Sequence, residues 1–159
     1  RGEFFEEYLQ PRSPMGLLDL LEMDLIPPLG GIYREDLLPQ KLRPRLKAKP
    51  GYRELSLDGI VLSHAHLDHS GYISLLRPDI PIYATAMTAF ISKAMQDSGK
   101  SDFEREVCYA IPRKEEGGLL RADRGGAARG RPFRLFSPPP PPGQCSPRPQ
   151  ASGAWPGPP

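Results

Sequence analysis

The chain has 159 residues, a formal net charge of +2 and two cysteines. This length allows one ordinary domain, and two cysteines exclude a framework of several disulfides. No apolar run approaches the ~20 residues that a membrane-spanning helix needs, and the charged N-terminal residues do not resemble a signal peptide. We therefore expect a cytoplasmic protein with no membrane partner, and the oligomeric state stays open.

Three short helical pieces are predicted in the first 53 residues. Apolar residues recur on one helical face in residues 3–9, and the leucines of 16–23 predict a short helix that packs on a core. A single helical turn is expected at 35–38. Residues 39–53 are basic and contain several prolines, so we expect a solvated loop there.

The middle of the chain alternates between two kinds of pattern. Apolar runs predict strands at 59–63 and 80–84. A helix is predicted after each strand, at 71–76 and at 86–98. The predicted order is therefore strand, loop, helix, strand, helix.

The helix predicted at 86–98 has the most regular apolar pattern in the chain. Thr85 can serve as its N-cap, and Gly99 stands where a helix end is expected. We expect its apolar stripe to face the core, rather than to form a cofactor site. The stripe consists of Met87, Phe90, Ile91, Ala94 and Met95.

The composition changes abruptly at Gly117. From there to residue 159 glycine, proline and arginine dominate, with five consecutive prolines at 138–142. Such a segment buries too little apolar surface to offset the entropy lost on ordering. We therefore expect one partial domain over 1–116 and a disordered or polyproline-like tail over 117–159.

Charge follows the same division. Residues 1–116 contain 15 Lys and Arg against 18 Asp and Glu, a net of −3, whereas 117–159 contain 6 Arg against one Asp, a net of +5. The slightly acidic first part argues against strong binding of a phosphate backbone by charge alone. The tail is interpreted either as a proline-rich docking segment or, as the favoured alternative, as sequence with no selected function, such as an out-of-frame translation of GC-rich DNA.

All three histidines of the chain lie within one six-residue window. His64, His66, Asp68 and His69 form the pattern His-x-His-x-Asp-His directly after the strand predicted at 59–63. Imidazole and carboxylate are ligands that zinc and similar divalent ions take. In an extended segment, residues two apart point to the same side, so His64 and His66 can reach one ion. Asp68 and His69 follow where the chain turns and can face a second ion, which predicts a two-metal hydrolytic site.

Residues 63–71, which contain this motif, resemble the signature of the metallo-β-lactamase fold superfamily of hydrolases. The likeness extends over about 55–112 and is closest to the ribonuclease J and β-CASP type nucleases. The resemblance implies an α/β fold class, with a partial metallo-β-lactamase-like αββα sandwich followed by the tail.

The resemblance also implies a role for each residue of the motif. His64 and His66 would bind the first of two zinc ions, and Asp68 and His69 would bind the second. Asp68 would in addition orient the attacking water and accept its proton, as the catalytic residue. The helix that follows would begin near Ser70 and direct its positive end toward the site.

Two departures from the family pattern qualify this interpretation. No histidine follows His69, whereas a complete site in the family takes two more histidines and a bridging aspartate further along the chain. The strand hairpin with which the family domain begins is also missing. We therefore expect this chain to be a piece of the family domain with an altered C-terminal part and an incompletely packed sheet.

The expected function is metal-dependent hydrolysis, with an RNA or DNA phosphodiester as the substrate in the parent family. A first alternative is hydrolysis of a thioester, lactam or lactone by the same fold. A second alternative is a non-catalytic remnant that binds metal weakly, and it is the favoured one for this chain because the outer ligands are missing.

Overall fold

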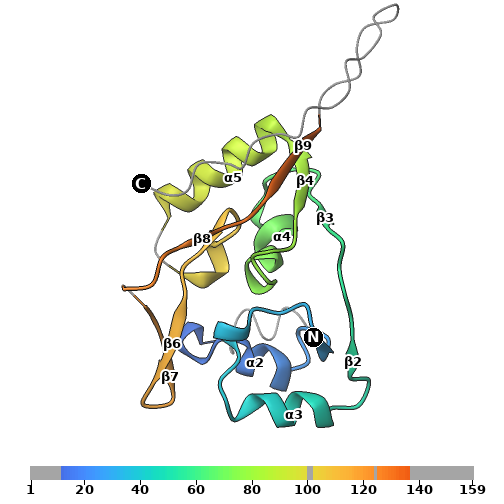
Figure 1. Cartoon of the computed structure of the whole chain (residues 1–159), viewed down its shortest axis with the longest axis vertical. Helices are drawn as coiled ribbons and strands as arrows, with labels where there is room; N and C mark the ends of the chain where they lie inside the picture. Colours follow the sequence, from blue (N-terminus) through green and yellow to red (C-terminus); the bar gives the residue numbers. More distant parts are fainter. Residues whose placement is uncertain (1–11, 100–101, 124, 137–159) are drawn as a thin grey trace, which may run out of the picture. The chain divides into compact units, whose positions relative to one another are not determined.

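The structure combines helices with short strands, as expected for the α/β class (Figure 1). The computed structural model describes three stretches of the chain, residues 12–99, 102–123 and 125–136. They divide into two compact units, each made of two segments. The first unit comprises 12–56 with 111–127, and the second unit comprises 57–110 with 128–136.

Short helices and two pairs of strands make up the first unit. Strands β1 and β2 pair in parallel, whereas β6 and β7 form an antiparallel hairpin. The hairpin turns through Gly117 and Gly118, whose φ angles of 61° and 80° favour glycine at both positions of a two-residue turn. In chain order the elements are η1 (Ser13–Met15), α2 (Leu17–Glu22), β1 (Leu29–Gly30), η2 (Glu35–Leu37), α3 (Leu42–Ala48), β2 (Arg53–Glu54), β6 (Arg113–Glu116) and β7 (Leu119–Ala122).

A charged pair with a fully buried arginine and a partly buried aspartate lies within the first unit. The Arg34 side chain is fully buried and donates two hydrogen bonds to the Asp36 carboxylate, at 3.0 and 2.7 Å, and one to the carbonyl of Ile111 at 2.9 Å. The Asp36 carboxylate also accepts a bond from the backbone N–H of Arg113. Burial opposes ionisation of Asp36, but the hydrogen bonds and charge of Arg34 outweigh it, so the pKa of Asp36 lies below its ordinary value.

The second unit is built around a three-stranded parallel sheet. Its strand order is β3-β4-β9, and Ile60, Ile82 and Phe133 are aligned across it. A separate antiparallel pair joins β5 to β8. In chain order the elements are β3 (Ile60–Val61), α4 (Leu67–Ser70), η3 (Gly71–Leu75), β4 (Ile82–Thr85), α5 (Ala86–Ser98), η4 (Phe103–Arg105), β5 (Tyr109–Ala110), β8 (Arg129–Gly130) and β9 (Phe133–Phe136).

One face of the parallel sheet is buried and the other is open. In β4, Ile82 and Ala84 are fully buried, whereas Tyr83, which alternates with them, is exposed. Phe136 of β9 is also exposed, and its ring lies 6.1 Å from that of Tyr83. The buried face packs in a core that consists of Leu62, Ile73, Ile82, Ala84, Ala89, Val107, Cys108 and Phe133.

Three helical predictions agree with the structure. The helices predicted at 16–23 and 86–98 are confirmed as α2 and α5, and the turn predicted at 35–38 is the 3-10 helix η2. The N-cap of α5 is also confirmed, because the Thr85 side chain accepts a bond from the N–H of Thr88 at 3.1 Å.

The predicted strand positions are close but not identical to the observed ones. The strand expected at 59–63 is only two residues long, and the one expected at 80–84 begins two residues later, at Ile82. The helix expected at 71–76 is the 3-10 helix η3, and α4 precedes it. The helical face predicted at 3–9 lies outside the described residues.

The loop predicted at 39–53 was wrong, because helix α3 lies within it. Pro44 is the third residue of this helix, where the backbone N–H has no partner within the helix and its loss costs little. Leu42 and Leu46, one turn apart, are both buried. The free energy gained by burial of these two leucines outweighs the cost of the proline and of the basic residues around it.

The orientation predicted for α5 was also wrong. Met87 and Phe90 are 67% and 63% exposed, and the rest of the apolar stripe is exposed as well. Thr88, Ala89 and Ser92 are the buried residues of this helix. The helix follows β4 with no intervening loop, so the strand direction fixes which face meets the sheet, and small side chains on that face allow close packing.

The segment expected to be a tail contributes strands to both units. Residues 119–122 form β7 of the first unit, and β8 and β9 belong to the second unit. The structure therefore differs over 117–136 from the predicted tail at 117–159, and the units do not divide after residue 116. Pairing with β4, β5 and β6 compensates for the weak apolar content of these residues. The five prolines at 138–142 lie outside the described residues.

None of the helices in the described stretches has the length and apolar content required to cross a membrane. The longest of them, α5, has 13 residues.

Candidate metal centre

The histidine motif, called the histidine loop below, spans the connection between β3 and α4 and continues into α4 itself. His64 and His66 precede the helix, whereas Asp68 and His69 lie within it. Leu62 and Ala65 are buried on the inner side of this connection, at 3% and 6% exposure. His66 adopts an extended conformation as the N-cap of α4, and its carbonyl accepts bonds from the N–H groups of His69 and Ser70 at 3.0 and 2.9 Å. The helix therefore begins at Leu67, earlier than the predicted start near Ser70. Leu62, Ala65 and Ser70 are buried, whereas His66, Asp68 and His69 are exposed, so this segment packs on the core while most of its polar side chains reach solvent.

Three imidazole rings lie together on this loop. The ring of His64 is 5.0 Å from that of His66 and 4.3 Å from that of His69, measured between ring centroids. The Oγ of Ser63 lies 2.9 Å from Nδ1 of His64, which gives the central ring a hydrogen-bonding partner. Ring contacts of this kind bring nitrogen donors from one short segment into a single cluster.

Asp68 lies at the edge of the imidazole cluster. Its Oδ2 is 3.4 Å from Nε2 of His69, and the two side chains are 77% and 55% exposed. Exposed side chains change rotamer on the ps–ns timescale, so neither group is held in one orientation. Asp68 is within reach of a proton or an ion that binds at His69.

The grouping differs from the predicted pairing of ligands. The sequence predicted one pair, His64 with His66, and a second pair, Asp68 with His69. In the structure the His64 ring contacts both of the other imidazoles, so the three rings form one group.

A formed coordination shell is not present among the residues that the structure describes. In those stretches no group of three or more His, Cys, Asp or Glu side chains is arranged to hold a metal ion. The donor types and their proximity fit zinc, but the ring orientations are those of edge and tilted contacts rather than of nitrogens that converge on one point. Metal binding here requires rotation of exposed side chains, not movement of the core.

Cys108 does not take part in this cluster. It is 6% exposed within the core, and burial raises the pKa of its thiol to about 12. A thiol with this pKa stays protonated near neutral pH and is a poor metal ligand or nucleophile. Cys108 is thus a small residue of the core, and Cys145 lies outside the described residues.

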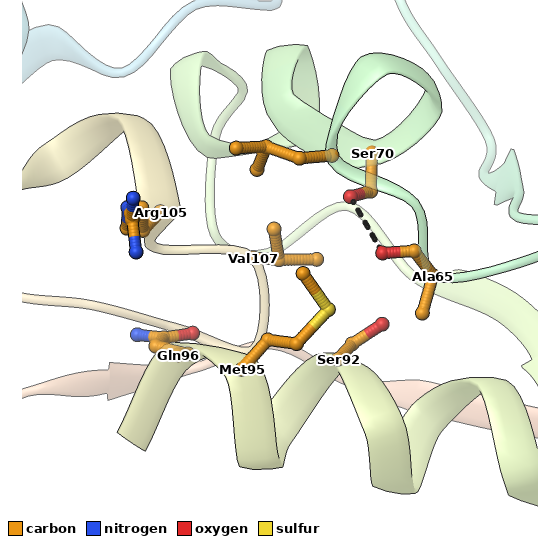
Figure 2. Close-up of a pocket in the computed structure, with 8 residues that line it drawn as sticks. Ala65, Ser70, Ser92, Met95, Gln96, Arg105 and Val107 are labelled. Carbon is orange, nitrogen blue, oxygen red and sulfur yellow. Dashed lines mark hydrogen bonds between the residues drawn. The ribbon is translucent and has the colours of Figure 1, made fainter. Parts of the chain in front are cut away.

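A small pocket lies behind the histidine loop and was not predicted from the sequence (Figure 2). Its volume is about 110 Å³. It is formed by segments that are distant in sequence, so no local pattern marks it. The lining residues are Ala65, Leu67, Ser70, Ser92, Met95, Gln96, Arg105 and Val107.

Comparison of the chain with models of known protein families, with curated proteins and with solved structures gives no match.

Proposed function

We propose that His64, His66 and His69, with Asp68, form a binding loop for a divalent metal ion, zinc being the best suited. The observation that carries this proposal is the contact of three imidazole rings, 4.3 and 5.0 Å apart, on a loop whose backbone is anchored by buried Leu62 and Ala65. Neutral imidazole is the commonest protein ligand for such ions.

The proposed binding step needs only local rearrangement. The side chains of Asp68 and His69 are mostly exposed, and His66 is exposed as well. Rotation of these groups brings their donor atoms onto one ion while α4 and the core remain in place. Since the rings are not preorganised, part of the binding energy is used for ordering them, and the affinity is lower than in a preformed site.

We further propose that this chain derives from a metal-dependent hydrolase with a metallo-β-lactamase-like αββα sandwich. The substrate of that parent enzyme would be a phosphodiester of RNA or DNA. The support is the strand, histidine loop, helix, strand, helix order of β3, α4 with η3, β4 and α5. An ion bound there would supply Lewis-acid polarisation and lower the pKa of a water molecule. In this proposal Asp68, whose Oδ2 lies 3.4 Å from Nε2 of His69, would orient that water and accept its proton.

For this chain by itself we propose metal binding without efficient turnover. The sequence contains no histidine beyond the three of the loop. A hydrolytic site with two ions needs more ligands than these four side chains supply, and a homodimer would add no histidine of a different kind. Hydrolysis of a thioester or lactone is the alternative within the same fold.

Zinc titration of the 159-residue chain by calorimetry tests this proposal. We expect one ion per chain, and we expect His66→Ala to weaken binding by more than ~100-fold, since even loss of a group behind a metal ligand costs about 10–100-fold. Asp68→Asn should weaken binding, whereas the matched control Asp58→Asn, also exposed, should not. Equal affinity for the parent chain and His66→Ala would overturn the proposal.

Turnover is measured in the same samples with a phosphodiester reporter and a thioester reporter. We expect neither to be hydrolysed at a rate that depends on zinc. Zinc-dependent hydrolysis that His66→Ala abolishes would replace the binding-only proposal, and the preferred reporter would identify the substrate class.

A further inference from the structure

We propose that the pocket behind the histidine loop binds a small, uncharged, mainly apolar molecule with one hydroxyl group, of about four to six non-hydrogen atoms. Its volume of about 110 Å³ is somewhat below that of an apolar cavity that holds benzene, about 150 Å³. All the lining residues belong to the second unit.

The apolar character of the ligand follows from the walls of the pocket. Figure 2 shows α5 along one side, with Met95 directed inward, and Val107 between this helix and the histidine loop. Leu67 and Ala65 add apolar surface from the loop side. A ligand with a hydrocarbon body gains from removal of this surface from water.

The single hydroxyl of the ligand follows from Ser92. This residue is 4% exposed, and its Oγ has no hydrogen-bond partner among the described residues. A buried polar atom without a partner is costly, and a ligand hydroxyl in the pocket would satisfy it.

The other polar groups of the lining are already engaged or lie at the edge. The Gln96 amide donates to the carbonyl of Tyr109 at 2.7 Å and accepts from the N–H of Cys108 at 2.7 Å. Ser70 donates to the carbonyl of Ala65 at 3.5 Å, drawn as the dashed line in Figure 2. Ser92 is therefore the hydroxyl available to a ligand.

The absence of charge on the ligand follows from the segment around Arg105. Arg105 is exposed, and Asp102, Glu104 and Glu106 flank it in sequence. A carboxylate would meet one cation in a locally acidic segment, so we expect a neutral molecule to bind better.

The pocket also has a consequence for the histidine loop, and this part rests on the proposed metal binding. Ala65 and Leu67 line the pocket, whereas His64, His66 and Asp68 alternate with them. A molecule in the pocket fixes the loop from behind, which removes part of the ordering cost of metal binding. We expect a saturated pocket to tighten zinc binding by about 3-fold or more, with the reciprocal effect on the pocket ligand.

Titration of the 159-residue chain, free of metal, with cyclopentanol tests the pocket by itself. Backbone amide NMR should show saturable shifts at Ala65, Met95 and Val107, with a Kd of ~0.1–10 mM, as expected for six non-hydrogen atoms. Butyrate, also with six non-hydrogen atoms, should bind at least ~5-fold more weakly. The absence of saturable shifts with cyclopentanol would overturn the proposal that the pocket binds a ligand. Tighter binding of butyrate would overturn the proposal that this ligand is uncharged.

Two serine variants of α5 provide a matched comparison. Ser92→Ala should weaken cyclopentanol binding by about 5–10-fold, as for loss of one hydrogen bond, and raise the Tm of the unliganded chain. Ser98→Ala, on the same helix but outside the pocket lining, should leave the affinity unchanged. Equal affinity in the two variants would overturn the role of Ser92.

The effect on zinc is measured last, by repeating the zinc titration with saturating cyclopentanol. Tighter zinc binding that is absent in Ser92→Ala supports the coupling. Unchanged zinc affinity with normal cyclopentanol binding overturns the coupling alone. Absence of zinc binding together with normal cyclopentanol binding overturns the proposed metal function and leaves the pocket standing.

Discussion

The Arg34–Asp36 pair of the first unit and the histidine loop of the second unit use polar residues in opposite ways. Arg34 is fully buried, and its partners hold it in one geometry. Asp68 and His69 are mostly exposed and lie 3.4 Å apart, and His69 otherwise contacts the ring of His64. A buried polar group stabilises a fold only when its bonds are satisfied, whereas an exposed cluster of donors is free to bind something else. Stability and ligand binding are thus expected to respond separately to mutation.

The largest expected effect on stability is that of Arg34→Met. Removal of the guanidinium leaves the Asp36 carboxylate in a largely buried site without its main partner, which costs about 3–5 kcal/mol. The measurement is denaturant unfolding of both chains. Arg45→Met is the control, because Arg45 and Glu22 form an ion pair with both side chains largely exposed. It should change the free energy of unfolding by less than ~1 kcal/mol. Similar losses in the two variants would contradict the contrast between buried and exposed pairs.

Arg131→Met should destabilise the second unit by about 2–3 kcal/mol, because a charged donor is lost and buried carbonyls are left without it. Arg131 is 2% exposed and donates to the carbonyls of Leu76 and Arg77, both at 2.8 Å. The exposed Arg134 provides the control, since Arg134→Met should have little effect. Denaturant unfolding measures the free energy of unfolding of both variants, and hydrogen exchange in α5 then measures the stability of the second unit. If Arg131→Met is as stable as the parent chain, residues 128–136 are not part of the second unit.

The two faces of α5 should respond oppositely to substitution. Ala89 is 2% exposed and packs in the core, so Ala89→Leu overpacks it and costs about 1–3 kcal/mol. Phe90 is 63% exposed, so Phe90→Lys should stay within about 0.5 kcal/mol of the parent chain. Thermal unfolding of the two variants compares them directly. A larger loss for Phe90→Lys would mean that the apolar stripe faces the core, as the sequence predicted.

The smallest expected effect is a change in the acid limb of the stability profile. The pKa of Asp36 is below its ordinary value of 3.8 in the folded chain, so the carboxylate stabilises the fold above that value. This stability is lost as the pH falls below 3.8 through the lowered folded pKa. Asp36→Asn should remove this part of the pH dependence, which denaturant unfolding between pH 2 and 6 measures. If Asp36→Asn leaves the loss of stability at low pH unchanged, Asp36 and Arg34 do not form an ionised pair in the folded chain.

The sequence was sufficient for elements whose signal is local. The Thr85 cap and the length of α5 were predicted because a capping oxygen and a helical stop act within a few residues. The chemical nature of the candidate site was likewise visible, since all three histidines lie within six residues.

The sequence was not sufficient to predict features that depend on packing between segments distant in the chain. The apolar stripe of α5 predicted the wrong buried face, because the direction of β4 and the small residues Ala89 and Ser92 determine how the helix meets the sheet. The glycine-rich composition after residue 116 concealed β7, β8 and β9, whose pairing depends on strands elsewhere in the chain. The pocket behind the loop depends on Val107 and Met95, which no spacing rule joins to Ala65.

The most direct test of the metal-binding loop is zinc K-edge X-ray absorption on the 159-residue chain with one equivalent of zinc. We expect three imidazole nitrogens at about 2.0–2.1 Å from the ion, falling to two in His66→Ala if any zinc is retained. A spectrum of zinc surrounded only by water oxygens, unchanged by that substitution, would contradict this expectation.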